Sequence, residues 1–93
     1  MSTIFIAFVI NYCAYCDMFK EQALPGIIRS QDEHVVVYND STGEFEHGYV
    51  SNIDQYRKHA VGYPSYVLVQ DDQIIKYWYG FEPYNFWIEY NER

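Results

Sequence analysis

The stretch that decides the fold runs from Ile4 to Cys16 and reads Ile-Phe-Ile-Ala-Phe-Val-Ile-Asn-Tyr-Cys-Ala-Tyr-Cys. Residues 4–10 form a continuous apolar run of mostly β-branched and aromatic side chains. Such a run is typical of a strand that is buried on both faces, in the middle of a parallel or mixed sheet. After Cys13 the apolar spacing becomes helical, which predicts a helix over 14–24 that is ended or kinked at Pro25-Gly26. Both cysteines therefore lie where a buried strand passes into a helix.

Further along, strand-like and helix-like segments alternate. The expected segments are a strand over 34–38, a helix from the capping-box pattern Ser51-x-x-Asp54 to about Ala60, strands over 66–70 and 73–79 around an Asp71-Asp72 turn, and a helix over 83–92. The order is β-α-β-α-β-β-α. A β-α-β start requires parallel strands joined by a right-handed crossover, and the hairpin adds antiparallel pairing. We expect one α/β domain over 1–93, with a four-stranded mixed sheet and helices on both faces.

Composition excludes several classes of partner. The chain has 93 residues, 49% of them hydrophobic, and carries a net charge of −7. Nucleic acids and anionic membrane surfaces attract clustered Lys and Arg, and the largest such cluster here is Arg57-Lys58. The apolar run at 4–10 is too short to span a bilayer, and it lacks the charge and cleavage pattern of a signal peptide. We expect no nucleic acid or membrane partner and a cytoplasmic location.

The two cysteines point to chemistry rather than to a disulfide framework. A small secreted domain held by disulfides has four or more cysteines spread along the chain, whereas both cysteines here lie in one tetrapeptide. Cys13 is expected at the helix N-cap, where free N–H groups and the positive end of the helix dipole stabilise a thiolate. We therefore expect its pKa to be moderately lowered. Cys16, one turn further, is suited to the resolving role.

Two other interpretations of this Cys-x-x-Cys pair exist. It could be half of a zinc site, but the chain has no second cysteine pair, and His34, His47 and His59 lack the usual ligand spacing. The cysteines could also be two unreactive core residues. The strand-then-helix context favours redox chemistry, and we expect no bound metal.

Three motifs together resemble the thioredoxin/glutaredoxin superfamily over nearly the whole chain. They are Cys13-Ala14-Tyr15-Cys16 after a buried strand, Gly62-Tyr63-Pro64-Ser65 at the opening of a later strand, and Tyr79-Gly80 at the end of the hairpin. The resemblance implies a thioredoxin-like fold in which Pro64 is cis and faces the sulfurs. It also implies that the Tyr63 backbone pairs with an extended substrate and that Gly80 lies near the same groove. We expect Tyr12, Tyr15 and Tyr63 to form walls of that groove.

The chain departs from both branches of this superfamily. The Cys-x-Tyr-Cys pattern looks like glutaredoxin, yet no cation precedes Cys13, and Gly80-Phe81-Glu82 stands where a Gly-Gly-x-Asp-like turn is usual. The long hairpin looks more like thioredoxin. However, Ala7 replaces the buried Asp of that branch, and Asp17 replaces the Lys that commonly follows the second cysteine. An anionic glutathione therefore finds little positive charge at this site.

From these observations we expect a thiol–disulfide oxidoreductase that reduces protein disulfides through Cys13 and Cys16. The site residues are Cys13 and Cys16 for catalysis and, for substrate binding, Tyr12, Tyr15, Tyr63, Pro64 and Gly80. The resemblance implies that electrons come from a thioredoxin reductase-like flavoenzyme or from glutathione, with no cofactor beyond the redox-active disulfide. The alternatives are a glutathione-dependent glutaredoxin and a non-catalytic binding module with the same fold.

Overall fold

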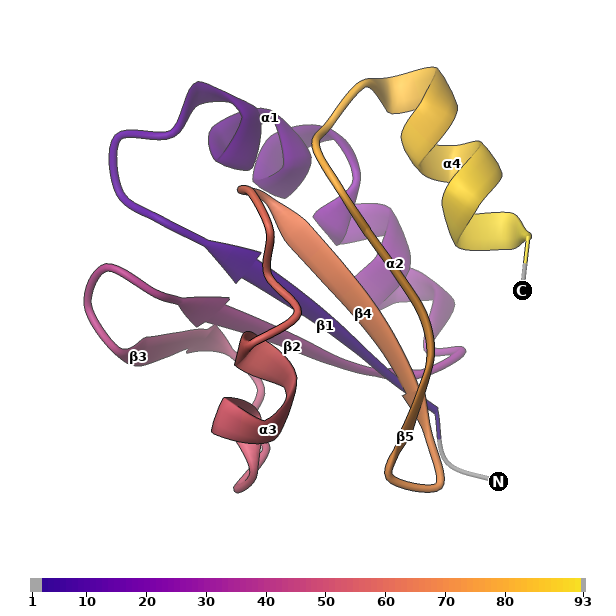
Figure 1. Cartoon of the computed structure of the whole chain (residues 1–93). Coiled ribbons are helices and arrows are strands. Elements are labelled where there is room, and N and C mark those ends of the chain that lie inside the picture. The colour runs from indigo at the N-terminus through magenta and orange to yellow at the C-terminus, as the bar shows by residue number, and fades with distance from the viewer. Residues whose placement is uncertain (1–2, 93) are drawn as a thin grey trace.

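The structure, a computed structural model, describes residues 3–92 and is a mixed sheet covered by helices on both faces (Figure 1). The elements in chain order are β1 (Thr3–Val9), α1 (Ala14–Gln22), α2 (Leu24–Ser30), β2 (His34–Asn39), β3 (Glu44–His47), α3 (Ile53–Arg57), β4 (Ser65–Gln70), β5 (Gln73–Tyr79) and α4 (Pro83–Asn91). The sheet order is β3-β2-β1-β4-β5. Helices α1, α2 and α4 lie on one face and α3 on the other. The expected α/β architecture with both faces covered is confirmed.

Strand β1 occupies the centre of the sheet because its side chains are apolar on both faces. Phe5, Ala7 and Val9 face the larger core cluster, which also holds Cys16 and the helical aromatics Phe19, Phe86 and Tyr90. Ile6 and Phe8 point the opposite way, into a second cluster with Ile53 and Tyr56 of α3. Residues 5–9 are all fully buried. Side chains alternate between the faces of a strand, so an uninterrupted apolar run fills two cores at once.

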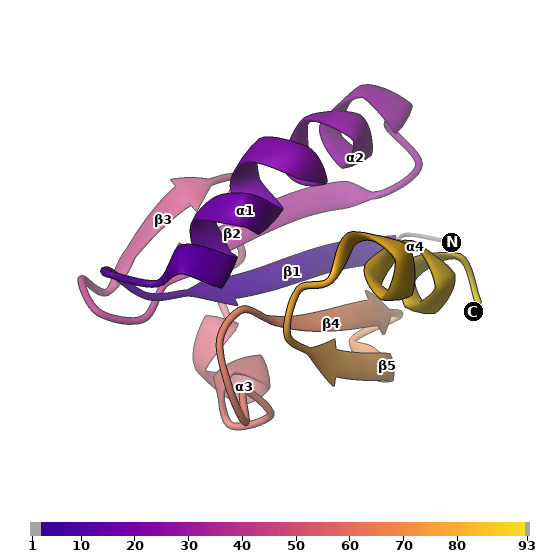
Figure 2. The ribbon, with the colours of Figure 1, turned by 90° about the horizontal axis from the view of Figure 1, so that it is seen from above.

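The pairing of β1 with its neighbours positions the site. β1 runs parallel to β2 and antiparallel to β4, and Val9 at its end lies in register with Asn39 at the end of β2. The carboxyl ends of parallel strands meet at one edge of a sheet. The segment that carries the cysteines, which follows β1, therefore lies beside the turn that follows β2, as the view from above shows (Figure 2).

The sheet has five strands, so the expectation of four was wrong. The additional strand β3 pairs antiparallel with β2 at the sheet edge. Residues 40–43 form the turn between β2 and β3. The strand Glu-Phe-Glu-His alternates polar side chains with Phe45, which packs on Tyr38. Three exposed polar residues in four give too weak an apolar pattern to predict a strand.

Two helix expectations are corrected. The first helix is interrupted as expected, but at Ala23 rather than at Pro25-Gly26: α1 ends at Gln22, and Pro25 lies in the first turn of α2, where its missing N–H is not needed. Helix α3 spans only Ile53–Arg57, and its N-cap is Asn52 without a side-chain cap bond, so the Ser51–Asp54 capping box does not form. By contrast, the β4–β5 hairpin and α4 lie within one or two residues of the expected bounds.

None of the helices in residues 3–92 is long and apolar enough to cross a bilayer.

Candidate active site

Cys13 and Cys16 form a disulfide at the N-terminus of α1, with Cα atoms 5.2 Å apart. Cys13 is the N-cap residue: its backbone is extended, and its Sγ accepts a hydrogen bond from the Cys16 backbone N–H at 3.1 Å. Cys16 is fully buried in the larger core cluster, whereas Cys13 is only partly buried. The sulfur in reach of a partner is therefore also the one that the helix N-terminus stabilises as a thiolate.

The loop before β4 lies directly against Cys13. The Tyr63–Pro64 peptide bond is cis, as the resemblance implied. The carbonyl oxygen of Tyr63 lies 3.9 Å from Cys13 Sγ, although fifty residues separate the two along the chain. Pro64 is buried. This loop therefore forms the wall opposite the disulfide.

Gly80 follows β5 on the same side of the molecule and is held by the loop before β4. Its backbone N–H donates to the Pro64 carbonyl at 2.7 Å, and its own carbonyl accepts a hydrogen bond from the Tyr66 hydroxyl at 2.8 Å. Its φ of +89° is a left-handed conformation that favours glycine, and a Cβ there would meet no atom within 4 Å. The space above Gly80 is consequently open.

A cavity of about 700 Å³ adjoins this space, between β5 and the start of α4. Its walls are mainly aromatic, and they include Tyr15, which lies between the two cysteines in sequence, and Gly80. The lining residues are Tyr15, Val61, Tyr77, Trp78, Tyr79, Gly80, Phe81, Glu82, Asn85, Phe86 and Glu89. The charged residues in that set are both acidic. The cavity therefore offers apolar contact area next to the disulfide and no positive charge.

The three tyrosines that we assigned to one groove lie in different surroundings. Tyr15 lines the cavity beside β5 and is 59% exposed. Tyr12 stands fully exposed at a left-handed backbone position. Tyr63 packs against both core clusters, and its hydroxyl donates to Asp40 Oδ2. That bond to Asp40, burial and the Asp40 charge together raise the pKa of Tyr63 to about 12.

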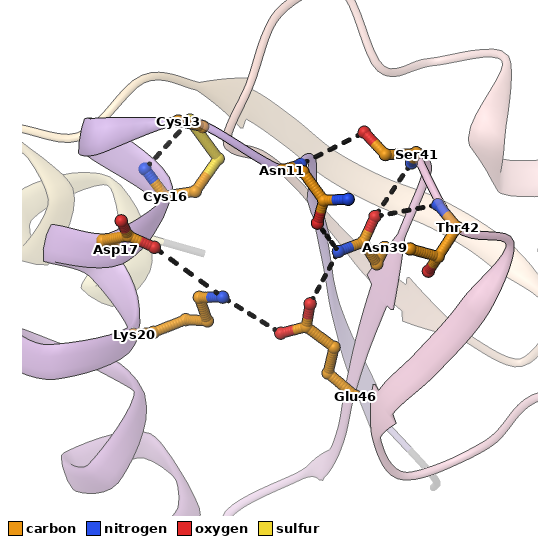
Figure 3. Close-up of polar contacts among 9 residues, drawn as sticks. All are labelled: Asn11, Cys13, Cys16, Asp17, Lys20, Asn39, Ser41, Thr42 and Glu46. Carbon is orange, nitrogen blue, oxygen red and sulfur yellow. Dashed lines mark hydrogen bonds and ion pairs between the residues drawn. A yellow bond between two sulfur atoms is a disulfide. The ribbon is translucent and has the colours of Figure 1, made fainter.

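A second set of side chains around the disulfide was not found from the sequence. It is a polar network that joins the segment before Cys13 and helix α1 to the β2–β3 hairpin (Figure 3). Asn39, only 4% exposed, lies at its centre. Its Nδ2 donates to Asn11 Oδ1 at 2.9 Å and to Glu46 Oε2 at 2.8 Å, and its Oδ1 accepts from the backbone N–H groups of Ser41 and Thr42. The register of two parallel strands could have predicted this neighbourhood, since Asn11 and Asn39 both follow or end such strands.

Glu46 connects this network to helix α1. Its Oε1 accepts a hydrogen bond from Lys20 Nζ at 3.1 Å, and Lys20 also lies 3.9 Å from Asp17. Partial burial raises the pKa of Glu46, but the hydrogen bonds from Asn39 and Lys20 and the Lys20 charge outweigh it, so the pKa lies below its ordinary value. Lys20 is the first cation after the cysteines in the sequence. Its charge is thus directed to two carboxylates.

The remaining expectations about the site concern acids and metals. Ala7, which stands where the thioredoxin branch has a buried Asp, is fully buried in the same cluster as Cys16. Within residues 3–92 no group of three or more His, Cys, Asp or Glu side chains could hold a metal ion. The disulfide is the functional group of the site.

Comparison with solved structures finds two thioredoxins among the similar folds. Thioredoxin f2 of Chlamydomonas reinhardtii superposes with a TM-score of 0.71 at 13% identity, covering 98% of this chain and 78% of that one. The germline-specific thioredoxin Deadhead of Drosophila melanogaster gives a TM-score of 0.65 at 15% identity, covering 94% and 76%. No protein-family model and no curated protein sequence matches the chain.

The site and fold define the class of small α/β proteins that carry a disulfide at the start of a helix beside a cis-proline loop. Within that class, this chain has the thioredoxin-like fold and carries a Cys-x-x-Cys pair at the start of α1.

Proposed function

We propose that this protein is a thiol–disulfide oxidoreductase that reduces disulfides in other proteins. The observation that carries the proposal is the unequal placement of the two sulfurs. Cys13 is partly accessible and lies at the N-cap of α1, and Cys16 is bonded to it from inside the core. One sulfur is placed to attack a partner and the other to attack the first.

The reaction starts from the dithiol form. The Cys13 thiolate attacks one sulfur of the substrate disulfide, forms a mixed disulfide, and releases the other substrate sulfur as a thiolate, which takes up a proton. Cys16 then loses its proton and attacks Cys13 Sγ. The second substrate thiol leaves and the Cys13–Cys16 disulfide forms, so two electrons pass from the protein to the substrate.

A protein substrate fits the surroundings better than glutathione does. The cavity beside the disulfide has aromatic walls and two acids, Glu82 and Glu89, and Lys20 is paired with Glu46 and Asp17. Glutathione is anionic, so it would meet no free positive charge among these residues. We therefore propose that the electron donor is a thioredoxin reductase-like flavoenzyme. We also propose that the protein works in the cytoplasm.

The catalytic step is tested by trapping. In Cys16→Ser the mixed disulfide on Cys13 cannot be resolved, so protein partners should accumulate as reducible adducts, and insulin should give one such adduct. The matched control is the double variant Cys13→Ser/Cys16→Ser, which should trap nothing. If Cys16→Ser forms no adduct with insulin and the native dithiol protein does not reduce it, the protein is a binding module and the proposal is wrong.

The donor is tested separately. NADPH with a thioredoxin reductase, or NADPH with glutathione and glutathione reductase, is supplied to the native protein together with insulin. We expect faster turnover with the first system. Faster turnover with glutathione would make the protein a glutaredoxin in function.

A further inference from the structure

Three segments form the active site: the residues just before Cys13, the helix that carries Cys16, and the Tyr63 loop, which is fifty residues from Cys13 in the sequence. Each of them is bonded to the β2–β3 hairpin. Asn11 Oδ1 accepts from Asn39, Lys20 pairs with Glu46, and the Tyr63 hydroxyl donates to Asp40. The close-up view shows the first two of these links at the two ends of the chain segment that contains the disulfide (Figure 3).

Asn39 has its full hydrogen-bonding capacity committed in this arrangement. A side-chain amide offers two N–H donors and an oxygen that accepts two bonds. Nδ2 makes its two bonds to Asn11 and Glu46, and Oδ1 accepts from two N–H groups of the following turn at 2.8 and 3.1 Å. The backbone N–H of Asn11 also donates to Ser41 Oγ at 3.1 Å. Because Asn39 is buried, water cannot replace these bonds, so the segment before Cys13 is tied to the turn.

Asp40, the next residue, acts on the opposite wall. Its backbone N–H donates to the Val9 carbonyl at 2.8 Å, which fixes it against the end of β1. Its carboxylate accepts from Tyr63 and, at 2.5 Å, from Arg57 Nε. Tyr63 is thus held at its ring while its carbonyl faces Cys13 Sγ. A carbonyl oxygen in this position would accept a hydrogen bond from the Cys13 thiol in the dithiol form and would disfavour the thiolate.

We propose that the turn after β2 is a clamp in which Asn39 and Asp40 are positioning residues for the redox couple. Asn39 fixes the segment that carries the disulfide, and Asp40, through Tyr63, fixes the carbonyl that faces the attacking sulfur. The inference rests on the proposed function in that it concerns the same two cysteines. A clamped segment keeps the two thiols close when the disulfide is open, and this favours the disulfide. Loss of the clamp gives the dithiol form more freedom and shifts the equilibrium toward it.

The first test measures the dithiol–disulfide equilibrium against dithiothreitol, read from the mass of alkylated protein. Asn39→Ala should shift the equilibrium toward the dithiol by about fivefold, the worth of one hydrogen bond, which is about 20 mV for a two-electron couple. Asn11→Ala removes the acceptor of the hydrogen bond from Asn39 at an exposed position, and it should shift the equilibrium in the same direction. Glu44→Ala is the control and should leave it unchanged, because Glu44 lies on the same hairpin and its backbone N–H donates to Thr42 rather than to the active-site segments.

The second test measures the pH dependence of Cys13 alkylation in the dithiol protein. Tyr63→Phe removes only the hydroxyl that Asp40 holds, so the carbonyl is released and the midpoint should move to lower pH than in the native protein and in Glu44→Ala. If Asn39→Ala does not fold, Asn11→Ala decides the first test. An unchanged equilibrium in Asn11→Ala overturns the role of Asn39, and an unchanged midpoint in Tyr63→Phe overturns that of Asp40.

Neither measurement needs turnover of a protein substrate. A protein that titrates as described but does not reduce insulin would refute the proposed function and leave the clamp supported. A protein that reduces insulin but shows no shift in either test would support the proposed function and refute the clamp.

Discussion

The two sides of the Cys13–Cys16 disulfide differ in the kind of side chain that lines them. On the side of β2 and β3 the contacts are polar and directional, and they converge on the buried side chain of Asn39. On the side of β5 and α4 the walls are aromatic, and Tyr15 and Tyr79 are 59% and 64% exposed. On the first side, the hydrogen-bonding groups of the buried amide find their partners within the chain. On the second side, part of the aromatic surface remains exposed to solvent. This difference indicates that one side fixes the sulfurs and the other is available to a partner.

The largest effect is expected from breaking the polar side. Asn39→Ala removes four hydrogen bonds from a buried position, so the free energy of unfolding should fall by about 2–4 kcal/mol. Urea unfolding of the oxidised protein measures this, and Glu44→Ala should stay within about 0.5 kcal/mol of the native value. A loss below about 1 kcal/mol would mean that this side is no more ordered than the other.

The aromatic side should behave in the opposite way. Tyr15→Ala removes an exposed ring from the wall next to the disulfide, so KM for insulin should rise about fivefold, while the unfolding free energy changes by less than about 0.5 kcal/mol. Tyr84→Ala is the matched control because Tyr84 is 72% exposed but lines a different cavity. Equal KM values in the two variants would remove the distinction between a binding side and a fixing side.

The smallest effect concerns the pH at which the Tyr63 hydroxyl ionises and its hydrogen bond to Asp40 is lost. Its folded-state pKa of about 12 is raised above the value of about 10 for an unfolded tyrosine, so its contribution to stability is complete below pH 10 and is lost as the pH rises through 12. The difference in absorbance at 295 nm between the native protein and Tyr63→Phe isolates this phenol. In Asp40→Ala its midpoint should fall toward 10. A midpoint that stays near 12 would show that burial, rather than Asp40, sets the pKa.

The sequence predicted the parts of the molecule that depend on local apolar pattern. The run at 4–10 identified the central strand, and the change of period at Cys13 placed the cysteines at a helix start. Both features follow from side-chain periodicity, which is visible in a single sequence. The β4–β5 hairpin was found for the same reason, and both Asp71 and Asp72 adopt the left-handed backbone that such a tight turn needs.

The parts that were missed depend on contacts between distant segments. β3 carries one apolar side chain, Phe45, so no pattern marks it as a strand. In the sequence alone, Asn39 and Asp40 are typical turn residues. Their contacts with the active-site segments become visible only when β1 and β2 are paired in register. For Tyr63, nothing in the sequence indicated that its hydroxyl donates to Asp40, twenty-three residues earlier in the chain.

The Tyr66 hydroxyl bond to Gly80 has a consequence for how a partner is received. The ring of Tyr66 packs between Phe5, Phe19 and Phe86 in the core, burial raises its pKa, and its oxygen reaches the backbone below the open space at Gly80. The floor beside the disulfide is therefore continuous with the buried aromatic core. Because the packed core supports this floor, we expect the ordering entropy of the proposed substrate binding to fall mainly on the substrate. Discrimination among substrates would then depend on which disulfide segments are flexible enough to adapt to that floor.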